Sequence, residues 1–471
     1  MKARPLTSVA RAVGGRLLGD DVWVNGVATD SRAVGPGHLF VALHGERMNG
    51  HRFVGEAFVR GAAAAMVSDS SSGDRPVVVV EETDSALREL ASDERASMAA
   101  EVVGVTGSTG KTSVKDLTAA VLGGRYRVSA SPRSFNTEVG VPLTMLNASA
   151  DAEVVVAELG SRGPGHIAAL CRVARPSIGV VTNVGMAHMA MFGSAEAVAD
   201  AKAELVEALP ESGTAVLNAD DPVVRTFVSR TRARPLLFGT AEDAEVRAED
   251  LSLDRLARPS FTLRAPGGTE RVELSVSGEH MAWNALAAAA CGIALGLSPG
   301  ECAAALKDAE VSSWRMEVAE SGTGLRVIND AYNANPASMT AALKALAWMA
   351  ARGESPKSDA GRAIAVLGEM AELGPIADRE HERVGELVAR LGIDHVVVVG
   401  RGARLIGAGA LREGVEADRI TTCRGVEEAV AAVRALGRPG DVVLVKGSRV
   451  AGLERLAAAL QDDRGRTAGA R

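Results

Sequence analysis

VVGVTGSTGKTSV, residues 102–114, is the stretch of this chain that decides its fold. The run Val102–Val105 is apolar and β-branched, which predicts a buried strand, and Ser113–Leu122 is predicted to be a helix. Between them lies a glycine-rich turn, whose backbone N–H groups can bind a polyphosphate together with the start of the helix. In such a turn Lys111 would neutralise the β- and γ-phosphates, and the Thr112 hydroxyl would bind Mg²⁺.

The glycine spacing departs from the strict GxxxxGK[ST] pattern by one position. The first glycine of that pattern would fall on Val105, and Gly104 lies one residue too early. A shortened form, TGxxGKT, fits, and the alternative is a turn that is merely rich in glycine. The strand before it, the helix after it and the Lys-Thr pair favour a phosphate loop. The predicted nucleotide-binding residues of the loop are Gly107, Ser108, Thr109, Gly110, Lys111, Thr112 and Ser113.

Length and composition indicate a folded protein of several domains. With 471 residues the chain exceeds the ~250–300 residues at which single cores stop growing, so two or three domains are expected. Hydrophobic residues make up 47% and charged residues 24%, as in ordinary globular proteins. The formal net charge is −7, with acidic and basic residues interspersed, so we expect no nucleic-acid partner.

Cysteine spacing and hydropathy bear on the compartment. No CxxC pair is present, so we expect free thiols in a reducing compartment and no zinc site. The N-terminal residues lack the apolar core of a signal peptide, and no run of ~18 apolar residues could span a bilayer. We therefore expect a cytoplasmic protein without a membrane partner. The cysteines are Cys171, Cys291, Cys302 and Cys423.

Outward from the glycine loop, the chain divides into three blocks. Residues 1–100 hold short apolar runs typical of a small α/β domain. Residues 101–311 alternate strands and helices, as in a parallel sheet covered on both faces. Residues 312–471 repeat that rhythm, with the polar stretch Arg352–Arg362 expected to be a surface loop. The predicted fold is α/β with three domains: a small N-terminal domain, a central P-loop ATPase domain and a C-terminal Rossmann-like domain, both of the latter with parallel sheets.

Three further residues are candidates for the catalytic edge of the central sheet. Glu158 ends the run VVVAE, at the carboxyl end of a predicted strand, where parallel sheets bind ligands. It is therefore a candidate metal ligand, and the alternative is an ordinary surface acid at a strand end. His188 follows the predicted strand Ile178–Thr182, although a lone histidine is usually structural. Lys202, in ADAKAEL, has on pattern alone the appearance of an ordinary solvated lysine.

Taken together, these segments resemble the Mur ligases, ATP-dependent amide-forming enzymes of peptidoglycan synthesis, over nearly the whole chain. By that resemblance TGSTGKT is the ATP loop, Glu158 and His188 match metal ligands, and Lys202 matches a lysine that is carbamylated. The resemblance implies Lys111, Glu158, His188 and Lys202 as catalytic residues. It implies Thr112, Glu158, His188 and Lys202 as metal ligands.

The same resemblance extends to the nucleotide's other contacts. GEHMAWNALAAAA, residues 278–290, matches the helix beside the adenine, with Asn284 as its nucleotide-contacting residue. Arg315 in SSWRME and Asp330 in VINDAYNANP match residues of the third domain that reach the phosphates and the ribose. ATP and Mg²⁺ are the implied cofactors.

The variable segments resemble one activity within the family. DAYNANPASM (Asp330–Met339), LGEMAELG (Leu367–Gly374) and VKGSR (Val445–Arg449) resemble the member that joins D-alanyl-D-alanine to UDP-N-acetylmuramoyl-tripeptide through an acyl phosphate. The regions that hold the UDP-muramoyl substrate match TDSR, LFVALHGERMNGHRF and RSFNTEVGVP. The resemblance as a whole implies that residues 1–100 bind this substrate and that residues 101–311 bind ATP. It also implies that residues 312–471 close on ATP and bind D-alanyl-D-alanine. The implied substrate residues are Thr29, Ser31, Arg32, Asn136, Thr137, Tyr332, Asn333, Asn335, Lys446 and Ser448.

Several alternatives remain open at this point. Asn335-Pro336 can be an N-cap and first-turn proline, LGEMAELG a strand end, and VKGSR a strand passing into a helix. The nearest functional alternatives are the sister ligase that adds the third stem-peptide residue and folylpolyglutamate synthetase. The third-residue ligase normally carries a DNPR-type signature, and this chain has none. A P-loop switch is an alternative from another class, against which the three-domain layout speaks. The expected partners are the two substrates, with the chain acting as a monomer.

Overall fold

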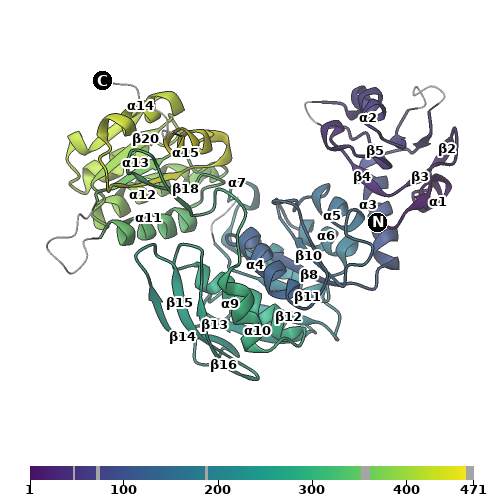
Figure 1. Cartoon of the computed structure of the whole chain (residues 1–471), viewed down its shortest axis with the longest axis horizontal. Helices are drawn as coiled ribbons and strands as arrows, with labels where there is room; N and C mark the ends of the chain where they lie inside the picture. The colour runs from purple at the N-terminus through teal and green to yellow at the C-terminus, as the bar shows by residue number, and fades with distance from the viewer. Residues whose placement is uncertain (46–47, 70–74, 186–188, 352–360, 463–471) are drawn as a thin grey trace.

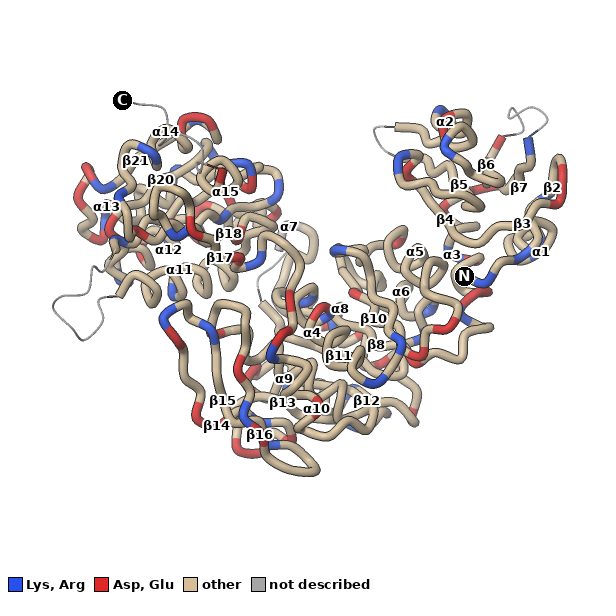
Figure 2. Tube along the Cα trace, viewed as in Figure 1, with Lys and Arg blue, Asp and Glu red and all other residues tan. Residues whose placement is uncertain are grey.

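The computed structural model describes residues 1–45, 48–69, 75–185, 189–351 and 361–462. Three α/β domains follow one another along the chain, with the central domain between the other two (Figure 1). Figure 2 shows acidic and basic residues side by side over all three domains, as the sequence predicts. Within the described ranges, helices are too short or too polar to cross a membrane.

The N-terminal domain is a small sheet in the order β2-β7-β6-β5-β4, parallel except for β2. Helix α2 packs on one face, and helices α1 and α3 pack on the other. Helix α3 also contacts α5 and α6 of the central domain, so one hydrophobic cluster continues between the two domains. The elements are β1 (Arg4–Pro5), α1 (Leu6–Ala12), β2 (Arg16–Leu18), β3 (Trp23–Val24), β4 (Gly26–Ala28), η1 (Ser31–Ala33), β5 (His38–Val41), η2 (Gly50–Phe53), α2 (Val54–Val59), β6 (Ala64–Val67), β7 (Val77–Val79) and α3 (Thr83–Ser97).

The central domain is built on a larger sheet in the order β16-β15-β14-β13-β12-β11-β8-β10-β9. Helices α4, α9 and α10 pack on one face, and α5, α6 and α8 on the other. The elements are β8 (Glu101–Thr106), α4 (Lys111–Gly123), β9 (Val128–Ala130), α5 (Gly140–Leu146), β10 (Val154–Glu158), α6 (His166–Ala174), β11 (Ile178–Val181), α7 (Met189–Phe192), α8 (Ala195–Glu207), β12 (Thr214–Asn218), η3 (Val224–Arg230), β13 (Arg234–Gly239), β14 (Val246–Leu253), β15 (Pro259–Ala265), β16 (Gly268–Glu273), α9 (Met281–Ala294) and α10 (Pro299–Lys307).

Strands β8, β10 and β11 confirm the strands predicted from runs of Val and Ile, because fully buried parallel strands are apolar on both faces. The edge formed by β14, β15 and β16 was not predicted. Strand β15 pairs antiparallel with both β14 and β16. Half-buried or exposed residues, several of them charged, interrupt the apolar runs of all three strands. Such one-sided strands lack the continuous apolar signal that identifies the parallel strands.

The C-terminal domain has a sheet in the order β17-β18-β22-β19-β20-β21, parallel except for β17. Helices α11, α12 and α13 pack on one face, and α14 and α15 on the other. Strands β19, β20 and β22 and the helices that follow them confirm the strand and helix alternation predicted for this block. The elements are β17 (Glu317–Glu320), β18 (Arg326–Asp330), α11 (Pro336–Ala350), β19 (Ala363–Leu367), η4 (Gly374–Ile376), α12 (Ala377–Arg390), β20 (His395–Val399), α13 (Arg404–Arg412), η5 (Ala417–Arg419), β21 (Ile420–Cys423), α14 (Val426–Leu436), β22 (Val442–Lys446), η6 (Arg449–Ala451) and α15 (Glu454–Gln461).

Strand order places the glycine loop where a ligand site is expected. Strand β8 lies between β10 and β11, so later strands are added on both sides of it and the strand order reverses there. Crevices at such reversal points, beyond the carboxyl ends of the strands, are the usual ligand sites of parallel sheets. The loop between β8 and α4 lies at this crevice.

Candidate active site

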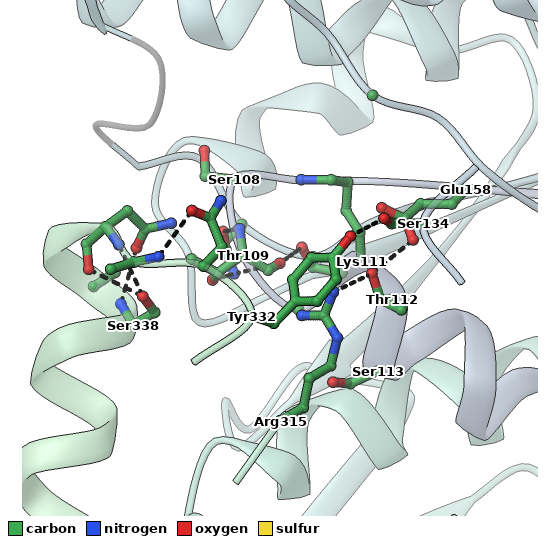
Figure 3. Close-up of a pocket in the computed structure, with 18 of the residues that line it drawn as sticks. Ser108, Thr109, Lys111, Thr112, Ser113, Ser134, Glu158, Arg315, Tyr332 and Ser338 are labelled. Carbon is green, nitrogen blue, oxygen red and sulfur yellow. Dashed lines mark hydrogen bonds between the residues drawn. The ribbon is translucent and has the colours of Figure 1, made fainter. Parts of the chain in front are cut away.

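A cavity of ≈ 800 Å³ lies between the central and C-terminal domains. Side chains from the carboxyl ends of both parallel sheets line it, and Figure 3 shows the side around the glycine loop. Most of the residues singled out in the sequence meet here. They are Ser108, Thr109, Gly110, Lys111, Thr112, Ser113, Asn136, Thr137, Glu158, Lys202, Asn284, Arg315, Asp330, Tyr332, Asn333, Asn335, Lys446 and Ser448.

Two positions of the loop require glycine. Gly107 has φ 150° and Gly110 has φ 80°, conformations that other residues rarely adopt. A Cβ atom on Gly107 would lie 1.8 Å from the Thr182 hydroxyl oxygen, and one on Gly110 would lie 2.7 Å from Asn284 Oδ1. The shortened glycine pattern therefore follows from close packing against the neighbouring strand end and against α9. Gly107 itself does not line the cavity, but its carbonyl accepts a hydrogen bond from Lys111 Nζ at 2.6 Å.

Glu158 and Thr112 form a buried, hydrogen-bonded pair of oxygen-bearing side chains beside the loop. Thr112 Oγ1 donates to Glu158 Oε2 at 2.7 Å, and Asn136 Nδ2 donates to Glu158 Oε1 at 2.7 Å. Glu158 is the last residue of β10 and is 1% exposed, so it lies at the carboxyl edge as predicted and is not a surface acid. Arg315 of the C-terminal domain donates from Nη2 to Thr112 Oγ1 at 2.7 Å (Figure 3).

Two lysines line the same cavity as this carboxylate. Desolvation lowers the pKa of Lys111, the charge of Glu158 partly offsets this, and that of Arg315 adds to it. Lys202, on α8, is 4% exposed, and burial together with the charge of Lys111 lowers its pKa to about 7. The interpretation of Lys202 as an ordinary solvated lysine, made on pattern alone, is therefore wrong. The tertiary fold removes its amine from water because α8 packs this face against the sheet.

The C-terminal domain contributes a second group of charged residues. Lys446, at the end of β22, donates from Nζ to Asp330 Oδ2 at 2.5 Å and to the Asn333 carbonyl at 2.9 Å. The Arg315 guanidinium lies over the Tyr332 ring, 4.2 Å from its centroid, an arrangement typical of a cation–π contact. The three basic and acidic side chains thus face the glycine loop from the opposite wall of the cavity.

Structural roles also emerge for residues of the variable motifs. Asn335 Oδ1 accepts from the backbone N–H of Ser338 at 2.9 Å, so Asn335 is the N-cap of α11 as the alternative interpretation holds. Ser448 Oγ accepts from the backbone N–H of Ala371 at 2.7 Å, which joins VKGSR to LGEMAELG. Thr137 Oγ1 accepts from the backbone N–H of Gly140 at 3.3 Å. All three residues nevertheless line the cavity.

Some predicted site residues lie elsewhere. Thr29, Ser31 and Arg32 lie just after β4 in the N-terminal domain and do not line this cavity. Arg32 there pairs with Asp30 at 2.7 Å. His188 lies outside the described residues, as does most of the loop predicted at Arg352–Arg362.

The structure adds residues that sequence reasoning missed. Asn183 Oδ1 accepts from the Thr109 backbone N–H at 2.9 Å and its Nδ2 donates to Thr109 Oγ1 at 2.7 Å, which holds the glycine loop. Ser134 Oγ and the Tyr332 hydroxyl share a hydrogen bond between the two domains (Figure 3). Trp283 Nε1 donates to Asp220 Oδ2 at 2.6 Å at the cavity wall. The polar residue after strand β11 was a usable signal for Asn183. Ser134 lies in the stretch RSFNTEVGVP, but its contact with the C-terminal domain was not predicted.

The fold and the site together define a P-loop nucleotide-binding protein whose site is completed by a second parallel-sheet domain. Comparison with known families agrees along the chain. Residues 24–99 match the Mur ligase family, catalytic domain, residues 105–292 match the Mur ligase middle domain, and residues 314–449 match the Mur ligase, glutamate ligase domain.

Individual relatives cover nearly the whole chain. It is 45% identical to the UDP-N-acetylmuramoyl-tripeptide--D-alanyl-D-alanine ligase of Mycobacterium tuberculosis, over 93% of this chain and 92% of that protein. Identity to the Bacillus subtilis protein of the same name is 34%, over 97% and 98%. Among solved structures, MurF from Acinetobacter baumannii superposes with a TM-score of 0.86 at 27% identity, over 98% and 100%. MurF from Thermotoga maritima in complex with ADP gives 0.79 at 29%, over 94% and 98%. This chain belongs to the Mur ligase family.

Proposed function

We propose that this protein is the ATP-dependent ligase that joins D-alanyl-D-alanine to UDP-N-acetylmuramoyl-tripeptide in peptidoglycan precursor synthesis. One observation carries the proposal furthest: a single cavity has the phosphate loop and Glu158 on one wall and Arg315, Asp330 and Lys446 on the other. The names and near-complete coverage of the curated relatives support the same substrates. The variable motifs DAYNANP, LGEMAELG and VKGSR supply part of the second wall.

The reaction needs ATP because a carboxylate is a poor electrophile in water. The terminal carboxylate of the tripeptide attacks the γ-phosphorus of ATP, which gives an acyl phosphate and ADP. The amine of D-alanyl-D-alanine then attacks the acyl carbon, and the tetrahedral intermediate expels phosphate as the amide forms. Lys111 offsets the negative charge that grows on the phosphates, and closure of the C-terminal domain excludes water from the acyl phosphate.

The donor set beside the loop fits Mg²⁺. The Thr112 hydroxyl and the Glu158 carboxylate are hard oxygen ligands 2.7 Å apart, which is the ligand type that this ion prefers. Glu158 is buried, and across the described part of the chain no Lys, Arg or His forms an ion pair with it. A bound Mg²⁺ would supply charge stabilisation to the transferred phosphoryl group. His188, which lies outside the described residues, remains a proposed ligand by resemblance.

Lys202 is the proposed site of carbamylation. A pKa of about 7 leaves a large share of its amine neutral near pH 7 to 8, and only the neutral amine attacks CO₂. The neutral nitrogen bonds to the carbon of CO₂ and loses a proton, so a buried amine becomes an anion with two oxygen ligands. That carbamate would complete the metal-binding group of Thr112 and Glu158.

The remaining assignments follow the same division of the chain. We infer that residues 1–100 bind the UDP-muramoyl peptide, with Thr29, Ser31 and Arg32 among its contacts, and that residues 101–311 bind ATP. Residues 312–471 would close on the nucleotide and bind D-alanyl-D-alanine. One chain supplies both walls of the cavity, which supports a monomer. We place the reaction in the cytoplasm because ATP and a UDP-linked precursor are its substrates.

Phosphate release against a panel of amines tests the proposal. Release should require ATP, UDP-N-acetylmuramoyl-tripeptide and D-alanyl-D-alanine together. Turnover of the UDP-muramoyl dipeptide with free diaminopimelate or lysine, and none with D-alanyl-D-alanine, would instead identify the sister ligase. Hydrolysis of ATP that is independent of any carboxylate substrate would identify a switch.

A further inference from the structure

The second turn of helix α4 carries a buried ion pair that has no part in the chemistry described above. Lys115 Nζ lies 2.8 Å from Asp116 Oδ1, and the two side chains are 3% and 17% exposed. They follow the phosphate-loop residues Lys111 and Thr112 by one helical turn. Replacing such a pair by apolar residues of similar size is often neutral or stabilising, so stability alone gives little reason for it.

Lys115 holds the segment that supports Glu158. Its ammonium donates to the carbonyls of Ser131 at 2.8 Å and of Arg133 at 2.9 Å. Ser131 Oγ in turn accepts from the backbone N–H of Glu158 at 3.1 Å. Three residues beyond Arg133, the Asn136 amide donates to the Glu158 carboxylate. The three N–H donors of Lys115 therefore all have partners, two of which belong to the loop that orients the candidate metal ligand.

Asp116 holds the start of the C-terminal domain. Its second oxygen, Oδ2, accepts from the Ser312 backbone N–H at 2.8 Å and from the Ser312 hydroxyl at 2.7 Å. Three residues later, Arg315 reaches Thr112. Trp314 and Met316 on either side of Arg315 have φ 64° and 53°, values that other non-glycine residues rarely adopt. A strained segment of this kind keeps its course only if its ends are held, and Asp116 holds one end.

We propose that Lys115 and Asp116 are positioning residues for the ligation reaction, which rests on the proposed function. Lys115 sets the position of the Ser131–Asn136 loop, and with it Glu158. Asp116 sets the point from which the Ser312–Met316 segment carries Arg315 into the cavity. Both side chains project from α4, the helix that begins at the phosphate loop. One rigid helix therefore positions the nucleotide, the Ser131–Asn136 loop and the Ser312–Met316 segment at the start of the C-terminal domain.

Substitutions at the two positions test this in the full-length protein. Lys115→Met and Asp116→Ala remove the contacts, and Lys115→Arg and Asp116→Glu are the conservative variants. Lys307→Met and Asp308→Ala are matched controls, because this Lys-Asp pair lies exposed at the end of α10. Phosphate release with both substrates gives kcat and the KM of each substrate. Hydrogen exchange of the nucleotide-free protein reads the backbone of residues 131–136 and 312–316 without any substrate.

The expected result separates positioning from folding. Displacement of reacting groups by about 1 Å costs on the order of 100-fold in rate, so kcat should fall by that order in Lys115→Met and Asp116→Ala while KM for ATP changes less than about twofold. The conservative variants should recover part of kcat, and the controls should match the wild type. Exchange should accelerate at residues 131–136 in Lys115→Met and at residues 312–316 in Asp116→Ala.

A double-mutant cycle tests the contact between Asp116 and Ser312. Ser312→Ala should lower kcat in the wild-type background and change nothing further in Asp116→Ala, because its hydroxyl then has no acceptor. Additive effects, unchanged kcat in folded variants, or a loss seen entirely in KM for ATP would overturn the proposal. If the wild type does not use D-alanyl-D-alanine, the proposed function fails. The positioning role has its own readout, because unaltered hydrogen exchange in the Lys115 and Asp116 variants would refute it whatever the substrate.

Discussion

Replacement of Lys202 by methionine should stabilise the protein at neutral and acid pH while abolishing ligation. The methionine side chain fills a similar volume and has no ionisable group. Burial and the charge of Lys111 lower the pKa of Lys202 from 10.5 to about 7, so the folded state disfavours the protonated amine. At 1.36 kcal/mol per pKa unit, this penalty amounts to about 5 kcal/mol below the folded pKa.

The sign of the pH dependence follows from proton binding. Between pH 7 and 10.5 the unfolded lysine binds more protons than the folded one, so the stability of the wild type rises with pH over this window. Relative to Lys202→Met, the wild type should gain about 3 kcal/mol between about pH 6.5 and about pH 9.5. The advantage of the variant should thus be largest below pH 7 and nearly vanish above pH 10.5.

Urea unfolding of both proteins across this range, in chelator and CO₂-free buffer, measures the difference. Lys344→Met is the matched control, because the same substitution is made there at an exposed position of α11. Added bicarbonate should stabilise the wild type and leave Lys202→Met unchanged. A stability difference between Lys202→Met and the wild type that is independent of pH would refute the burial of a neutral amine at this position.

Three further substitutions have defined outcomes. Lys111→Ala should abolish phosphate release with both substrates present, because the cation that offsets the phosphate charge is gone, and full turnover would refute the role of the loop. Gly107→Ala should weaken ATP binding, measured by calorimetry, by at least about tenfold, because the new Cβ would lie 1.8 Å from the Thr182 hydroxyl oxygen. Gly123→Ala is the control and should bind ATP normally, because a Cβ at Gly123 would have nothing within 4 Å. Tyr332→Phe removes the hydroxyl shared with Ser134 and should open the nucleotide-free protein in small-angle scattering, so an unchanged radius of gyration would argue against this contact as a brace between the domains.

The fold was largely predictable because its strongest signals are local. The Val-rich runs before the glycine loop and before Glu158 are buried on both faces, and such strands keep an unbroken apolar sequence. Antiparallel strands β14 to β16 escaped prediction because one side of them faces water and carries charged residues. Most of the candidate site was predicted through motif resemblance, and Thr29, Ser31 and Arg32 fall in a different domain from the cavity.

The sequence by itself determined the phosphate loop, since a strand, a glycine turn and a helix are specified by neighbouring residues. The tertiary structure alone decided what that loop faces. Ser134 and Tyr332 are 198 positions apart, and Thr112 and Glu158 are 46 apart. The first contact depends on how the C-terminal domain meets the central domain, and the second depends on the packing of α4 beside β10. The burial that lowers the pKa of Lys202 likewise arises from the packing of α8 against the sheet, which no local pattern around residue 202 records.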